Sequence, residues 1–330
     1  MRKFLSYFST GTWILLAVAI LLLWMLIWLV LPLRHPEIPA FQPADGIVAV
    51  VGDIDTESES TELAIELARD RFLDDDSGFF KRAGFSIALS LALPRSVTVW
   101  VVPGEHMSEP RYLAVVSLDR GGRIIRLLGR GVIKSQLIDS PRRTTRIAGT
   151  RVTYSTDVRD GMSPRAFAFT SDSLLVASDF AIIRDVLAPD VARAATQEYA
   201  AEIRELAPQS GELVVVASNR SAELTGLMDT VMTDYGFALM TSADALVSME
   251  ISGELTEGNI VGHGELIYSD PGRLGDGRSD VRFVYGALRR LLRPKGLDMD
   301  ADIAVGSDRV TVDFAVPGVA EYLRTGRESE

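Results

Sequence analysis

Residues 168–176 read AFTSDSLLV, and residues 304–312 read AVGSDRVTV. In both stretches apolar residues flank a Ser-Asp pair, which is typical of two strands joined by a tight turn. Serine and aspartate favour turns because their short side chains bond to the nearby backbone. A short helix is expected after each hairpin. We therefore predict that the two Ser-Asp pairs are turns rather than catalytic groups, and that the chain contains one structural plan twice.

Two spacings of apolar residues predict both strands and helices. Residues 85–93, FSIALSLAL, alternate large apolar residues with serine and alanine, which is the period of a strand. Residues 58–73 repeat apolar residues every three or four positions, as a helix does. Short turns between consecutive strands favour antiparallel pairing. The predicted class is α+β: a duplicated, mainly antiparallel sheet with helices packed on one face.

The chain of 330 residues is long enough for more than one folded unit. Within these units we also predict helices over 122–137 and 279–293, and a glycine-rich loop over 271–277. The predicted organisation runs as follows: a cytoplasmic N-terminus (1–11), a transmembrane helix (12–31), a proline-rich spacer (32–45), a first α+β unit (46–190), a linking helix (191–210), a second α+β unit (211–325) and a tail (326–330).

Residues 12–31, TWILLAVAILLLWMLIWLVL, contain no charged side chain. Twenty helical residues at about 1.5 Å each span a hydrocarbon core of roughly 30 Å. Trp13 and Trp28 lie near the two ends, where amphipathic rings favour the membrane interface. A cleaved signal peptide would have a shorter apolar region of about 7–15 residues. We therefore predict an uncleaved single-pass anchor.

The charges beside this segment predict its orientation. Arg2 and Lys3 precede it, whereas only Arg34 follows closely, so the N-terminus is expected in the cytoplasm. Only four of the 34 basic residues are lysine, a usage that favours a bacterial source. The predicted location is the bacterial inner membrane, with the C-terminal body in the periplasm.

Composition excludes several classes of function. The formal net charge of −11 argues against nucleic acid as a partner, because phosphate contacts need clustered basic residues. The absence of cysteine excludes disulfides, thiolate metal sites and a cysteine nucleophile. The three histidines, His35, His106 and His263, are far apart in the sequence, and none has a second histidine or a cysteine at zinc-site spacing. We therefore predict no metal and no cofactor.

Motifs of catalysis are also missing from the sequence. It contains no G-x-S-x-G nucleophile elbow, no S-x-x-K motif and no phosphate-binding glycine loop. We name no catalytic residues and predict that the protein is not an enzyme.

One segment departs strongly from the acidic background. Residues 119–151 contain nine basic side chains against Asp119 and Asp139. Six of the nine form the candidate site for an anion or a partner: Arg126, Arg130, Lys134, Arg142, Arg143 and Arg146. The first three are four residues apart and would share one face of a helix. The alternative is an internal match with the acidic segment 53–76.

Residues 165–187, which contain FAFTSDSLLVASDFAIIRDVL, resemble a bacterial family of membrane-anchored proteins that is known only as a domain of unknown function. Residues 302–324 repeat the pattern more faintly. The resemblance implies an extracytoplasmic, duplicated α+β fold with strand, turn, strand and short helix in tandem. It implies no catalytic residues.

Three functions remain open from the sequence. The first is a non-catalytic interaction or assembly module of the cell envelope, anchored in the lipid bilayer through residues 12–31. Its expected partner is an envelope protein, with an anionic lipid or polymer as the alternative. The second is a carrier of a lipid or other apolar ligand, because the small residues of 85–93 could leave space beside a sheet. The third is a cell-envelope hydrolase.

Overall fold

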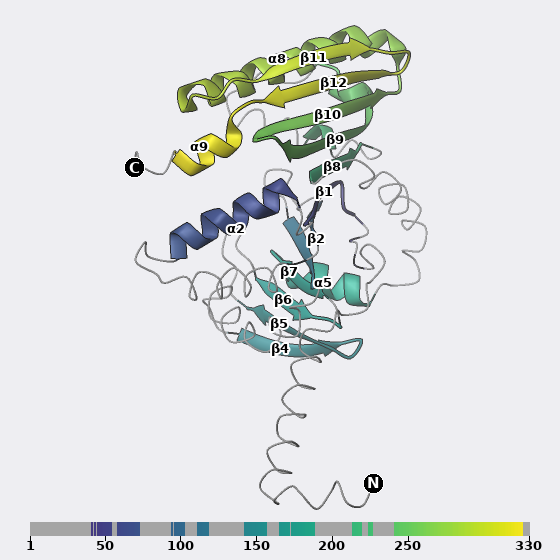
Figure 1. Ribbon diagram of the computed structural model, residues 1–330. Helices are drawn as coiled ribbons and strands as arrows, with labels where there is room; N and C mark the ends of the chain where they lie inside the picture. The colour runs from purple at the N-terminus through teal and green to yellow at the C-terminus, as the bar shows by residue number, and fades with distance from the viewer. Residues whose placement is uncertain are drawn as a thin grey trace, which may run out of the picture.

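The computed structural model describes residues 41, 43, 45–54, 58–72, 94, 96–102, 111–118, 142–156, 165–171, 173–188, 213–219, 224–226 and 241–325. Its strands form one antiparallel sheet, which runs from β11 at one end to β4 at the other (Figure 1). The spatial order is β11-β12-β10-β9-β8-β1-β2-β3-β7-β6-β5-β4. The α+β class and the antiparallel sheet are therefore confirmed.

The strands of the first half of the chain are β1 (Val48–Asp53), β2 (Ser96–Val102), β3 (Arg111–Ser117), β4 (Arg142–Ile147), β5 (Thr150–Ser155), β6 (Ala166–Phe169) and β7 (Ser173–Ala177). Those of the second half are β8 (Leu213–Ser218), β9 (Leu246–Thr256), β10 (Asn259–Tyr268), β11 (Asp300–Val305) and β12 (Arg309–Val316). The α-helices are α2 (Glu59–Phe72), α5 (Phe180–Leu187), α8 (Leu274–Leu292) and α9 (Val319–Thr325), with 3-10 turns η3 (Ala243–Ala245), η4 (Pro271–Arg273) and η5 (Arg293–Lys295).

Strands β1 and β8 join the two halves of the chain in the middle of the sheet. Val50 lies opposite Val215 in this antiparallel pair. On one side β2, β3, β7 and β6 follow in that order, and on the other side β9, β10, β12 and β11 follow. The β6–β7 hairpin pairs with β3 through its second strand, β7. The β11–β12 hairpin pairs with β10 in the same way, through β12. The division into units 46–190 and 211–325 stays a prediction.

Both quoted hairpins close through a backbone hydrogen bond across their tips. Thr170 N donates to Ser173 O at 2.9 Å, and Gly306 N donates to Arg309 O at the same distance. Ser307 and Asp308 thus form the tip of the β11–β12 hairpin, which confirms that pair as a turn. Ser171 occupies the matching position in β6–β7, and Asp172 lies outside the described residues.

Helices cover both faces of the sheet, so the prediction of helices on one face is wrong. Side chains alternate along a strand. Ala49 and Val216 therefore share the face on which Ile183 of α5 packs. Val48 and Ala217 point to the other face, where Val281 of α8 packs. The central strands are apolar on both sides because each side has its own helix.

Helix α8 begins within the segment predicted as a glycine-rich loop. Leu274 opens it after η4, and Gly277 lies inside it. A Cβ atom at Gly277 would lie 2.6 Å from the Tyr268 ring, so glycine lets the helix approach the sheet closely. The predicted loop over 271–277 is therefore wrong beyond residue 273.

Several predicted elements lie outside the described residues. They include the anchor (12–31), the strand over 85–93, the helix over 122–137 and the linking helix (191–210). Among the helices that the structure describes, none is long and apolar enough to cross a membrane.

Candidate functional site

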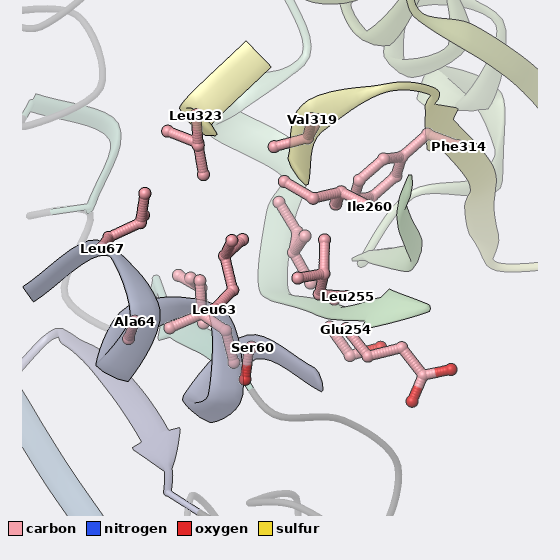
Figure 2. Close-up of a pocket in the computed structure, with 15 residues that line it drawn as sticks. Ser60, Leu63, Ala64, Leu67, Glu254, Leu255, Ile260, Phe314, Val319 and Leu323 are labelled. Atoms are coloured by element: carbon pink, nitrogen blue, oxygen red, sulfur yellow. The ribbon is translucent and has the colours of Figure 1, made fainter. Parts of the chain in front are cut away.

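A groove of about 430 Å³ lies between α2, α9 and the sheet (Figure 2). Strand β9 provides much of its floor, and α2 and α9 provide side chains from two separate segments. The side chains and backbone that line it come from Ser60, Leu63, Ala64, Leu67, Leu213, Val215, Ile251, Ser252, Gly253, Glu254, Leu255, Ile260, Phe314, Val319 and Leu323.

Two glycines shape the floor of the groove. Gly253 of β9 lies directly opposite Gly262 of β10. The Phe314 ring fills the space above Gly262, where an added Cβ would collide with it. Above Gly253 an added Cβ would meet only Val261 O, at 3.7 Å. The groove is therefore deep at Gly253 because no neighbouring side chain covers that glycine.

Helix α2 is fixed to the second half of the chain by two polar contacts. Glu59 Oε1 accepts a hydrogen bond of 2.7 Å from Gly258 N in the β9–β10 turn. Glu66 and Arg324 of α9 form an ion pair at 3.0 Å. These two acids of segment 53–76 therefore contact the second half. The groove depends on both halves because α2 covers strands that come after residue 213.

The groove is almost entirely apolar. Leu63 and Ile251 are typical of the side chains that enter it. Ser252 and Glu254 have the alternate orientation on β9, so they contribute mainly backbone. Figure 2 shows the Glu254 carboxylate pointing away from the leucine side chains. The site can bury an apolar group, but it offers few polar groups to orient a reacting substrate.

A serine, a histidine and an aspartate lie in a row on the opposite face of the sheet. Ser252, His263 and Asp313 occupy facing positions on β9, β10 and β12. His263 Nδ1 lies 2.7 Å from Asp313 Oδ1, and both side chains are more than half exposed. Ser252 Oγ donates to the backbone carbonyl of His263 at 3.4 Å. The row lies on a different face from the groove and lacks the serine–imidazole bond of a catalytic triad.

Glu250 on this same face makes stability depend on pH. Burial raises its pKa, the facing Glu265 raises it further, and His263 opposes the shift. A carboxyl group with a raised pKa in the folded state binds more protons there than in the unfolded state, so it lowers stability as pH rises above about 4.

We expect Glu250→Gln to raise the melting temperature at pH 7 and to lose this advantage below about pH 4. Thermal unfolding between pH 3 and pH 8 measures the effect. Glu254→Gln is the matched control because it removes the same charge from an exposed position on the same strand and face. A stabilisation of the Glu250 variant that is equal at all pH values would contradict the assigned cause.

Three of the predicted site residues lie on β4. Arg142, Arg143 and Arg146 are exposed on this outermost strand. Arg146 lies directly opposite Arg151 of β5, a like-charge pair that disfavours the sheet unless an anion approaches. Among the residues that the structure describes, no carboxylate forms an ion pair with Arg143, Arg146 or Arg151. The other three predicted residues, Arg126, Arg130 and Lys134, lie outside the described residues.

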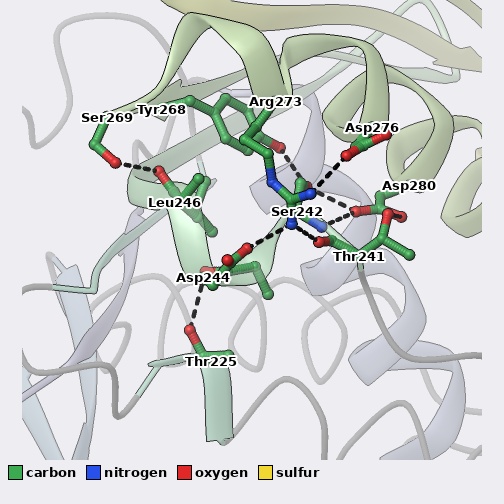
Figure 3. A network of polar contacts seen from close by, with 12 residues as sticks. Thr225, Thr241, Ser242, Asp244, Leu246, Tyr268, Ser269, Arg273, Asp276 and Asp280 are labelled. Atoms are coloured by element: carbon green, nitrogen blue, oxygen red, sulfur yellow. Dashed lines mark hydrogen bonds and ion pairs between the residues drawn. The ribbon is translucent and has the colours of Figure 1, made fainter.

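A buried polar network fixes α8 to the segment before β9 (Figure 3). Asp280 of α8 accepts hydrogen bonds from Ser242 N at 2.8 Å, Ser242 Oγ at 2.7 Å and Thr241 Oγ1 at 3.1 Å. Arg273 bonds to Thr241 O and pairs with Asp244 at 2.9 Å. Ser242 is fully buried, so its hydroxyl group serves structure rather than nucleophilic attack. No sequence motif marks these residues.

The chain matches no protein-family model and no curated protein sequence. Its structure is similar to crystal forms of the protein TP0453. For crystal form I the identity is 10%, the match covers 88% of this chain and 96% of that chain, and the TM-score is 0.39. For crystal form III the identity is 9%, with 85% and 96% covered and a TM-score of 0.43. The resemblance to a family of unknown function stays a prediction.

Proposed function

We propose that this protein is a non-catalytic interaction module of the bacterial cell envelope. Residues 12–31 hold it in the inner membrane, and its body lies in the periplasm. The groove between α2, β9 and α9 binds the apolar face of an amphipathic segment of an envelope protein. The apolar groove is the observation that carries this proposal.

The form of the groove favours a protein segment. Its volume of about 430 Å³ falls within the range of specific binding sites. Helices α2 and α9 both supply lining residues above the strand floor, which suits an inserted helix with anchors at every third or fourth position.

Site-specific photo-cross-linking in cells tests this function. A photoreactive amino acid replaces Ala64, which is exposed and lines the groove on α2. A second chain carries the same group at Thr311, which lies on the opposite face of β12. We expect one defined envelope protein to be attached at position 64 and not at position 311. Adducts of bulk neighbours at both positions would contradict the proposal.

The same groove supports a second candidate, a carrier of a lipid or other apolar ligand. Its lining would accept an acyl chain because it demands few polar contacts. Extraction of the purified full chain and mass spectrometry of the extract would identify a bound lipid. We expect Gly253→Phe, which fills the floor, to remove that lipid if this candidate is right. Equal lipid content in both proteins would exclude the groove as the site.

A further inference from the structure

The two outermost strands of the sheet carry opposite charges. Strand β4, RRTTRI, presents three exposed arginines, and strand β11, DADIAV, presents the exposed Asp300 and Asp302. Each strand has six residues. Each pairs on one side only within the part of the chain that the structure describes. An edge strand of this kind is a template for pairing with another chain.

We propose that β4 of one copy pairs with β11 of a second copy, so that the sheet continues from molecule to molecule. The sheet has twelve strands, and every neighbouring pair is antiparallel. The first and the twelfth strands therefore run in opposite directions. If a second copy is placed beside the first in the same orientation, its β11 lies antiparallel to β4 of the first copy. The antiparallel hydrogen-bond pattern of the sheet then continues across the contact.

The alternation of side chains sets the faces of this contact. Following the registers across the sheet, Arg143 and Asp302 belong to the same face. With all six positions overlapping, Thr144 lies opposite Ile303, and Arg143 is a diagonal neighbour of Asp302. A long arginine side chain reaches such a diagonal neighbour, and an opposite-charge pair across strands is stabilising.

Pairing of identical edges is disfavoured by the same charges. Two β4 strands would bring arginines together, and two β11 strands would bring aspartates together. Charge therefore favours pairing of β4 with β11 over pairing of two identical strands. Specific interfaces use the same kind of repulsion to exclude wrong partners. Because β4 and β11 are different surfaces, their pairing leaves one free edge on each copy, so copies add in an open row. The row closes into a ring only if the rotation between successive copies adds up to a full turn. The basic strand is thus assigned to a second copy rather than to an anionic lipid.

Disulfide trapping in membranes tests this pairing, and the full chain suits it because it has no cysteine. Cells co-express a Thr144→Cys chain and an Ile303→Cys chain with different tags. We expect a mixed disulfide, since facing residues of paired strands have Cβ atoms about 5 Å apart. Ala301→Cys replaces Ile303→Cys to detect a register shifted by two residues. The control pairs Thr144→Cys with Thr311→Cys, which lies on the inner strand β12.

Charge exchange supplies the second readout. Arg143→Glu in the Thr144→Cys chain should lower the yield of mixed disulfide about fivefold, and Asp302→Arg in the other chain should restore it. A yield no higher than that of the control pair, for both registers, would overturn the proposal. A second result would also overturn it: an Arg143→Glu chain that loses binding to vesicles of anionic lipid but keeps the mixed disulfide at full yield. The basic strand would then bind a membrane surface.

Discussion

Replacement of Asp280 by alanine is expected to lower the free energy of unfolding by about 4 kcal/mol. The carboxylate accepts three hydrogen bonds, from Ser242 N, Ser242 Oγ and Thr241 Oγ1. It is 7% exposed, and Ser242 is fully buried, so water cannot easily replace the lost acceptor. The variant would therefore separate α8 from the segment before β9.

Urea unfolding of the full chain in detergent measures this loss. Asp276→Ala is the control, because Asp276 is on the same helix but forms an exposed pair with Arg273 at 2.9 Å. We expect that control to lose less than about 1 kcal/mol. Asp280→Asn keeps one acceptor oxygen and should fall between the two variants. Equal losses for Asp276→Ala and Asp280→Ala would show that the buried network contributes nothing special.

Replacement of Gly262 by alanine is also expected to have a large effect and to lower the free energy of unfolding by about 3 kcal/mol. The added Cβ would lie 2.5 Å from Ser252 O and would collide with the Phe314 ring. The ring can turn away, but the carbonyl belongs to the neighbouring strand of the ladder. The strand pair β9–β10 would therefore have to shift, and the groove beside it would change shape.

Gly253→Ala is the matched control, since Gly253 lies directly opposite Gly262 and has open space above it. We expect this control to be neutral or slightly stabilising, because glycine within a strand costs conformational entropy. Combining Gly262→Ala with Phe314→Leu should recover only part of the loss. Full recovery would mean that the ring alone, and not the Ser252 carbonyl, causes the clash.

The sequence predicts much of this fold where a pattern is local. The repeated Ser-Asp pair predicted the β11–β12 hairpin, and apolar spacing predicted a helix over 58–73, where α2 runs from Glu59 to Phe72. Strand β4 was missed because three of its six residues are arginine and it lacks an apolar face. The sequence contains one sign of the turn after β4, which is Gly149. This glycine has a positive φ of 81° in the structure.

The candidate site could not be predicted because it depends on contacts distant in sequence. Glu59 and Gly258 are 199 residues apart, and their hydrogen bond places α2 over β9. No periodicity indicates that a helix of the first half covers strands of the second. The predicted arginines have a different outcome: Arg142, Arg143 and Arg146 gather on one strand, but at the edge of the sheet and away from the groove lining.

The proposed function requires that the partner bind in the groove. Its most direct test compares the photo-adduct at position 64 in the otherwise native chain, in Gly253→Phe and in Thr311→Phe. The first variant fills the floor of the groove, and the second adds the same side chain to the opposite face. We predict that Gly253→Phe folds normally and loses the adduct, while Thr311→Phe keeps it. An undiminished adduct in a folded Gly253→Phe chain would show that the partner binds outside the groove.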